Sequence, residues 1–503
     1  MIKKVALIFI TLFFCLFLAF FYHKQIFTLR FFDEEETLAA GKYLNQGEHL
    51  YLDLVTSHQP LTTISSSFLQ KVSHPDNLFM LIKRHREAMI IYSVIWDIVL
   101  VASAGFTGFL FVLIFETTKI LLFGNLFIAE SLITYPLIFL VIFATKKIRV
   151  TYKHAFIYGI LITSCLFLLS PIWPLIIYLA YLLVKKFNLR QRWIFLLGSI
   201  VVLLIVVPFL NPLKYWEHTI INNFKYTIPA TSYFGPWYIT FAKGFFAPLI
   251  SLTHLNGSLL LWLERGLTVG LLTYFIISFL QHRYRPIIFT FVLLGLANLR
   301  FYTPGLDYYQ GFHSLPWFSL LVYLCVSSLT ESFQKIDTKL VKILIAGELG
   351  VIILLSSLIF IKYLLPPRDK QRDFYVNYSQ EESYGQVVKL LSNSPKDNLF
   401  VYPDNWLIYW SSGLNHGPKN FGFFQVLSQI PSFSKSVNDM FIKSPPTFFY
   451  CEKCSQSSFV NYLPQYDVIK RDGKNTDLYL LKTKILTLTQ EQLKQLKYFQ
   501  YNL

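Results

Sequence analysis

The sequence predicts an α-helical protein that crosses a membrane several times and carries a small soluble α/β domain at its C-terminal end. Of the 503 residues, 54% are hydrophobic and only 15% are charged, and the mean hydropathy is +0.46. Soluble globular domains carry about 25% charged residues, so this much apolar surface indicates a membrane-embedded body. Apolar runs of roughly 17–25 residues, the length that crosses a bilayer, recur along the chain until about residue 365.

The first apolar run covers about residues 5–28. Lys3 and Lys4 precede it, as in a secretory signal, but the run is long enough to span and no small-residue cleavage site follows, so we expect a retained helix. The next apolar region, 88–145, predicts three passes with breaks near Ala104–Gly108 and Phe123–Asn125. The other expected spans, which bring the total to about eleven, are 154–170, 171–184, 193–210, 258–280, 286–299, 314–331 and 343–364.

Basic residues cluster in the short segments between these runs. Cytoplasmic loops carry such an excess of Lys and Arg, so the pattern predicts a cytoplasmic N-terminus and an outer C-terminus in the plasma membrane. Two long loops, 29–87 and 211–257, are then also outside. The formal net charge is +16, but its scatter over many loops argues against nucleic-acid binding.

The second outer loop, 211–257, is rich in aromatic residues that Pro and Gly interrupt. This composition is typical of short helices that lie at the outer headgroup level. The composition changes again at Pro366-Pro367, which divides the chain into a membrane body, 1–365, and a soluble domain, 366–503. Helix and strand patterns alternate in the soluble domain, which favours an α/β fold. The expected elements are a helix over Glu381–Leu391 and strands over Asn398–Tyr402, Thr447–Cys451, Tyr466–Ile469 and Leu478–Leu481.

Five cysteines are present. Three of them lie in apolar spans, where a thiol is a small core residue. Cys451 and Cys454 form a Cys-x-x-Cys pair in the soluble domain. A local disulfide is the favoured interpretation, and a redox pair or half of a zinc site are the alternatives.

The first outer loop carries the strongest functional signal. Four consecutive carboxylates, Asp33 to Glu36, follow the first span directly, and Asp53 and His58 come after them. Acidic residues beside a bilayer are costly unless they are hydrated, paired or used. Transfer of a sugar from a lipid phosphate uses such groups: a carboxylate takes the proton of the acceptor, and cationic groups stabilise the leaving phosphate.

The order of motifs in this loop resembles the GT-C superfamily of polytopic glycosyltransferases. The matching residues are Asp33-Glu34, Gly-x-x-x-Tyr-x-Asp at Gly47 to Asp53, and His-x-Pro-Leu at His58 to Leu61. The resemblance is strongest over 30–90, and the protein O-mannosyltransferase and aminoarabinose-transferase branch, with its bacterial members of unassigned substrate, is the most similar.

The resemblance implies that Asp33 is the base that activates the acceptor, with Glu34 as its neighbour in binding or orientation. Tyr51, Asp53 and His58 would belong to the substrate-binding loop. Simpler roles stand beside these. The acids can be favoured by the dipole of a helix N-terminus, Asp53 can pair with a base in its own loop, and His58 can be an ordinary polar loop residue.

Three basic residues are candidates for the donor phosphate. The resemblance implies an Arg at the start of the second span, where Arg84 and Arg86 lie, and an Arg and a His near Arg300 and His313. Arg suits a phosphate because of its fork of donors. The alternative for each is an anchor at the membrane interface. Among the acids within spans, the resemblance singles out Glu130 as a substrate-site candidate, and the alternative is a pair with a basic partner in the helix bundle. The others are Asp97, Glu116, Glu264 and Glu348, of which Glu116 and Glu264 are expected to be structural.

The sequence therefore predicts an inverting membrane glycosyltransferase. Its donor would be a polyprenyl-phosphate hexose or pentose, and its acceptor a protein, lipid or cell-surface glycan. No metal ligands are assigned, and a divalent metal remains open because the branches of the superfamily differ in it. The alternatives are a transporter or lipid flippase, in which the acids relay protons or substrate, and a scaffold for surface-glycan assembly. The missing repeat of two halves argues against a transporter.

Overall fold

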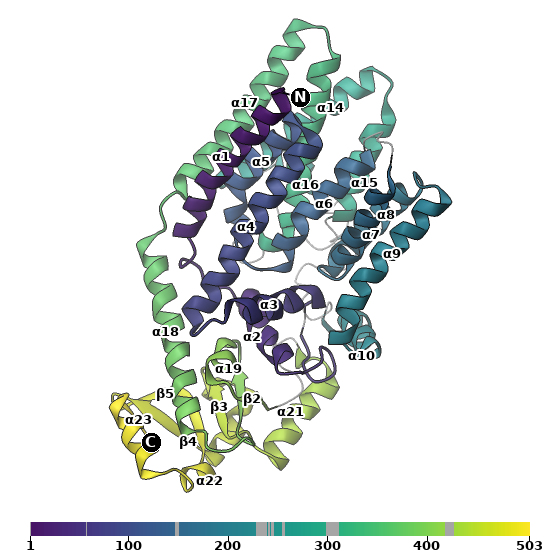
Figure 1. Cartoon of the computed structure of the whole chain (residues 1–503). Coiled ribbons are helices and arrows are strands. Elements are labelled where there is room, and N and C mark those ends of the chain that lie inside the picture. The colour runs from purple at the N-terminus through teal and green to yellow at the C-terminus, as the bar shows by residue number, and fades with distance from the viewer. Residues whose placement is uncertain are drawn as a thin grey trace. The chain divides into compact units, whose positions relative to one another are not determined.

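The computed structural model describes residues 2–56, 58–145, 150–227, 239, 242, 246–253, 257–297, 311–417 and 427–503. The chain divides into two compact units, each built from distant stretches of sequence (Figure 1). Unit 1 comprises 1–26, 85–205 and 234–366. Unit 2 comprises 27–84, 206–233 and 367–503. Most of the predicted loop 29–87 thus shares a compact unit with residues 367–503.

Unit 1 consists of apolar helices, one for each expected span. A helix satisfies its own backbone hydrogen bonds, which a bilayer core requires. Six helical segments are long and apolar enough to cross a membrane among the described residues, and the protein is a multi-pass membrane protein. The helices are α1 (Ile2–Lys24), α4 (Leu78–Ala104, which starts in unit 2), α5 (Phe106–Thr118), α6 (Ala129–Thr145), α7 (Tyr152–Leu166), α8 (Trp173–Val184), α9 (Leu189–Val206), α14 (Leu259–Leu280), α15 (Tyr284–Ala297), α16 (Leu315–Lys335) and α17 (Lys339–Lys362).

Both breaks expected in 88–145 are confirmed. Gly105 separates α4 from α5 with φ 65°, a left-handed conformation that favours glycine. A Cβ on Gly108 would lie 2.6 Å from the carbonyl oxygen of Leu100, so α5 folds back closely on α4. The second break follows the short 3₁₀ helix η1 (Lys119–Leu122), where Phe123 has φ 58°. The helix α5 then packs against α1, α16 and α17.

Unit 2 contains a six-stranded sheet in the order β2-β1-β3-β5-β4-β6. Strand β1 is parallel to β2 and β3, whereas β3, β5, β4 and β6 pair antiparallel. The strands are β1 (Asn398–Tyr402), β2 (Asn415–His416), β3 (Phe448–Cys451), β4 (Tyr466–Arg471), β5 (Lys474–Leu481) and β6 (Tyr501–Asn502). The helices are α2 (Phe32–Asn45), α3 (Pro60–Ser73), α10 (Pro212–Trp216), the π-helix η4 (Glu217–Thr227), α18 (Arg368–Leu391), α19 (Leu407–Ser412), α21 (Pro431–Lys443), α22 (Lys482–Ile485) and α23 (Gln490–Tyr498).

The four predicted strands are confirmed, and so is the α/β character of the C-terminal residues. The strands β2 and β6 were not predicted because two residues carry no pattern. The helix α18 begins at Arg368, whereas the predicted helix began at Glu381. The prediction started too late because the first half of α18 is mostly charged and polar and shows no apolar periodicity. In the second outer loop, α10, η4 and a short helix, α13 (Ala247–Ser251), are described. Much of the predicted aromatic belt, from Tyr233 to Tyr238, lies outside the described residues.

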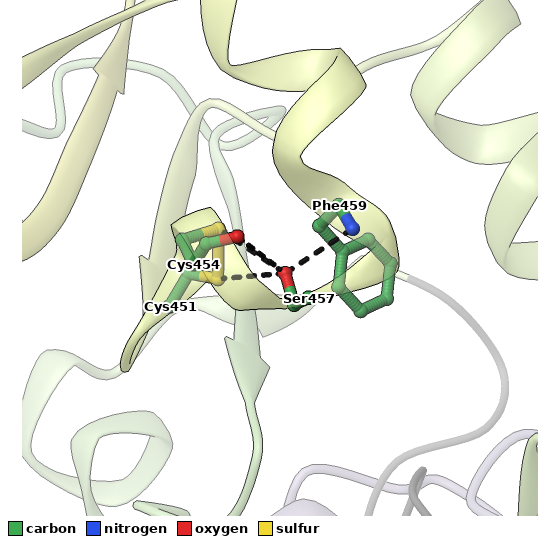
Figure 2. The surroundings of a disulfide bond; sticks show 4 residues. All are labelled: Cys451, Cys454, Ser457 and Phe459. Carbon is green, nitrogen blue, oxygen red and sulfur yellow. Dashed lines mark hydrogen bonds between the residues drawn. A yellow bond between two sulfur atoms is a disulfide. The ribbon is translucent and has the colours of Figure 1, made fainter.

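The predicted local disulfide is confirmed. Cys451 and Cys454 are bonded and buried beside the aromatic core of the sheet. The hydroxyl of Ser457 donates a hydrogen bond to the carbonyl of Cys454 at 2.8 Å, as Figure 2 shows. The bridge thus closes the short turn that follows β3.

Candidate functional site

The four consecutive carboxylates form the start of α2. The chain is extended at Phe31, and Asp33, Glu34 and Glu35 occupy the first turn, where the helix dipole favours negative charge. Successive residues of a helix point about 100° apart, so neighbouring side chains face different surroundings. The structure accordingly separates the four acids by their contacts.

Asp33 and Glu36 share a histidine. The Nε2 of His58 lies 3.1 Å from the Oε2 of Glu36 and 3.8 Å from the Oδ1 of Asp33. The other oxygen of Glu36 accepts a hydrogen bond from the hydroxyl of Thr56 at 2.7 Å. The Glu36 side chain is fully buried, whereas Asp33 and His58 are 25% and 22% exposed. Asp33 is therefore the more exposed of the two carboxylates beside His58.

Glu35 faces other partners. Its Oε1 lies 3.0 Å from the Nε of Arg30 and accepts a hydrogen bond from the hydroxyl of Tyr378 at 2.8 Å. Arg30 also reaches Glu381 on α18 at 2.8 Å. Glu34 is buried as well. The acids are thus more than a solvent-exposed cap of the helix, because Glu35 and Glu36 each accept a hydrogen bond from a buried side chain.

Tyr51 supports His58, and Asp53 does not join the group. The Tyr51 hydroxyl donates a hydrogen bond to the backbone carbonyl of His58 at 2.7 Å, and the Tyr51 ring packs edge-on against Tyr215. The carboxylate of Asp53 accepts a hydrogen bond from the backbone N–H of its own loop neighbour His49 at 3.1 Å. Asp53 is also 39% exposed. Its pairing matches the simpler of the two roles expected for it.

The structure pairs two residues of unit 1 that the sequence suggested separately. The Nδ1 of His313, on the 3₁₀ helix η5 (Gly311–Ser314), lies 2.8 Å from the Oε1 of Glu130 at the start of α6. A carboxylate on one ring nitrogen orients an imidazole and presents the other nitrogen in a fixed direction. Both side chains are mostly buried.

The arginine candidates have different outcomes. Arg84 lies on α4 and is exposed, whereas Arg86 is buried and donates a hydrogen bond to the carbonyl of Ile26. Arg86 thus joins α4 to the end of the first helical segment. Arg300 lies outside the described residues.

Unit 1 contains a buried ionic group that was not predicted from the sequence. The ammonium of Lys119 lies 2.7 Å from Glu116 and donates a hydrogen bond to the Tyr135 hydroxyl at 2.7 Å. In the same unit, the Cys15 thiol donates a hydrogen bond to the carboxylate of Asp97 at 3.4 Å. Glu116 is therefore paired inside the protein, as expected for a structural acid. Lys119 was the signal that sequence reasoning overlooked, because a lysine inside an apolar region demands a partner.

No cluster of three or more His, Cys, Asp or Glu side chains that could hold a metal occurs among the residues that the structure describes.

Comparison with solved structures decides the fold. The chain is similar to ArnT from Cupriavidus metallidurans in the apo state, with a TM-score of 0.51 and 9% identity, over 93% of this chain and 97% of ArnT. The chain has the GT-C fold. A second ArnT structure, bound to undecaprenyl phosphate, matches with a TM-score of 0.53 and 10% identity over the same shares of both chains.

This GT-C likeness is one of fold, because so few residues are identical. It extends over nearly the whole chain, whereas the sequence motifs support it mainly over 30–90. No protein-family profile and no curated protein sequence matches the chain.

Proposed function

We propose that this protein is a glycosyltransferase that moves a monosaccharide from a polyprenyl-phosphate donor to an acceptor at the outer face of the plasma membrane. The observation that carries the proposal is the accessible Asp33, held beside His58 and Glu36 at the start of α2 in a GT-C fold. The undecaprenyl phosphate bound to ArnT supports a polyprenyl-phosphate donor. The N-terminus would be cytoplasmic and residues 366–503 extracytoplasmic.

The reaction would be a single displacement. A hydroxyl or amine of the acceptor attacks the anomeric carbon while Asp33 accepts its proton, and the bond from that carbon to the phosphate oxygen breaks. The polyprenyl phosphate leaves with the electron pair, and the configuration at the anomeric carbon inverts. His58 and Glu36 hold the Asp33 carboxylate in place, and Glu34 lies next to it on the helix.

Charge grows on the leaving phosphate, so cationic donors are needed near it. We assign this role to Arg84, Arg300 and His313, with Glu130 orienting the imidazole of His313. Tyr51 would fix the backbone at His58 through its hydrogen bond to the carbonyl there. Asp53 would stabilise the turn at His49 in the same loop by accepting a hydrogen bond from the backbone N–H. The acceptor would be a protein, a lipid or a cell-surface glycan, and the sugar a hexose or a pentose.

A transporter or lipid flippase is the second candidate. The observation that favours it is the buried group of Asp97, Glu116 and Lys119 among apolar helices, since such groups mark proton relays in transport proteins.

The test is transfer in vesicles that contain the full-length protein. Radiolabelled undecaprenyl-phosphate mannose, glucose and arabinose would be offered to wild type, Asp33→Asn and Asp439→Asn. Asp439 is a matched control because its described contact is a surface pair with Lys443. Transfer by wild type and the control, lost in Asp33→Asn, supports the proposal. Lipid movement without transfer, measured in the same vesicles, favours the flippase.

A further inference from the structure

A buried network links the acidic turn of α2 to the C-terminal module, which we define as residues 367–503. Arg30, three residues before Asp33, is its centre. The guanidinium of Arg30 contacts Glu35 at 3.0 Å and Glu381 at 2.8 Å, and it donates a hydrogen bond to Asn405. Tyr378, one turn before Glu381 on α18, donates to Glu35. Both Glu35 and Glu381 are almost completely buried.

Helix geometry gives this network an effect on Asp33. Residues two apart in an α-helix point roughly 200° apart, so Asp33 and Glu35 face opposite sides of α2. Residues three apart share a side, and Asp33 and Glu36 accordingly both approach His58. Fixing Glu35 against α18 therefore fixes the rotation of α2, and this rotation aims Asp33 at His58.

The module holds the far end of α2 as well. The ammonium of Lys42 donates to the carbonyl of Trp410 at 2.6 Å, and the hydroxyl of Tyr43 donates to the carbonyl of Leu414 at 2.7 Å. Just past the helix, Glu48 pairs with His416 at 2.7 Å. The two ends of α2 are thus tied to the same module, so the helix has little freedom to turn or tilt within unit 2.

We propose that the C-terminal module is a positioning part of the transfer site, in which Glu381 and Tyr378, acting through Arg30 and Glu35, set the rotation of α2 and so the direction of Asp33. The assignment of Asp33 as the base rests on the proposed function; the control of α2 by the module does not. The module thereby gains a role in catalysis besides any acceptor binding.

Two carboxyl groups of the network have raised pKa values. Burial raises the pKa of Glu381 well above its usual range, and Glu35 and Asp404 raise it further, although Arg30 opposes them. Burial also raises the pKa of Asp404 to about 6. The guanidinium of Arg30 is thus the charge that lowers the pKa of both carboxyl groups.

The test measures amide hydrogen exchange of the full-length protein in nanodiscs, with the peptides over residues 32–45 as the readout. The variants are Glu381→Gln, Tyr378→Phe and the surface control Asp439→Asn. In Glu381→Gln we expect α2 to exchange about tenfold faster, while the sheet peptides over β3 and β5 keep their wild-type rates. Tyr378→Phe removes one hydroxyl only, so it gives the same pattern with a smaller change even where Glu381→Gln folds poorly.

Transfer from undecaprenyl-phosphate sugars provides the second readout. A positioning role predicts that kcat falls about tenfold in Glu381→Gln while the KM for the donor stays near wild type. Unchanged exchange in α2 overturns the proposal, and so does an equal acceleration over α2 and the sheet, which a purely structural role would produce. If α2 exchanges faster in Glu381→Gln but the wild type transfers no sugar, the control of α2 by the module is supported and the proposed function is contradicted.

Discussion

The imidazole of His58 lies between a buried carboxylate, Glu36, and an accessible one, Asp33. The histidine gives Asp33, whose Oδ1 lies 3.8 Å from its Nε2, an adjacent group on which a proton can be relayed.

The first prediction concerns Asp33 itself. Asp33→Asn keeps the shape of the side chain and removes its ability to accept a proton, so kcat for transfer should fall by about 10²–10⁴-fold. Thermal unfolding of the purified variant should stay within about 1 °C of wild type, because Asp33 is partly exposed. Full activity in a folded Asp33→Asn variant would exclude this residue as the base.

The second prediction separates Glu36 from Glu35. Glu36→Gln removes the negative charge behind His58, and we expect a tenfold to hundredfold loss of kcat, on the order of effects seen when supporting groups of a site are removed. The pH profile of kcat should also shift, because the charge next to His58 has changed. Glu35→Gln should lower kcat without moving the pH profile, since Glu35 contacts Arg30 and Tyr378 instead. Identical pH profiles for the two variants would contradict this division.

The third prediction treats Glu130 and His313 as one pair. Either Glu130→Gln or His313→Gln should raise the KM for the polyprenyl-phosphate donor, because each disturbs the oriented imidazole. The double variant should be little worse than the more damaging single one, since residues in direct contact are not additive. Steady-state kinetics of the three variants provides the measurement, and additive effects would show that the pair does not act together.

The fourth prediction concerns pH and Asp404. Burial raises the pKa of Asp404 to about 6, so the carboxyl group of Asp404 binds its proton more tightly in the folded protein than in the unfolded chain. The contribution of Asp404 to stability is then fully present below its usual pKa and is lost as pH rises through about 6. Asp404→Asn should therefore raise Tm at pH 8 by about 2 °C and have less effect near pH 4. If Asp404→Asn raised Tm more at pH 4 than at pH 8, this prediction would be contradicted.

The sequence was informative wherever a local pattern decides the structure. An apolar run becomes a helix in a bilayer whatever its neighbours are, so the helices and both breaks in 88–145 were predictable, as at Gly105. The short apolar strands of the module were predictable for a similar reason, and so was the placement of Asp33 and His58 in one loop.

The partners of the charged residues could not be predicted in this way. The hydrogen bond from Tyr378 to Glu35 joins residues 343 positions apart, and no local pattern reports such a contact. Lys119 shows the same limit at shorter range, because its three partners become visible only when the helices pack. The division of the acids into Asp33 with Glu36 on one side and Glu35 on the other likewise depends on what surrounds α2.

The link from Arg30 to Glu381 also has a consequence for how the protein is made. Arg30 leaves the ribosome early, but its partner is synthesised only after all the membrane helices. During insertion of these helices Glu35 therefore lacks Tyr378, and Arg30 lacks Glu381, until the C-terminal module has been made. A chain that is released before residues 378–381 are made would carry the acidic motif without these two contacts.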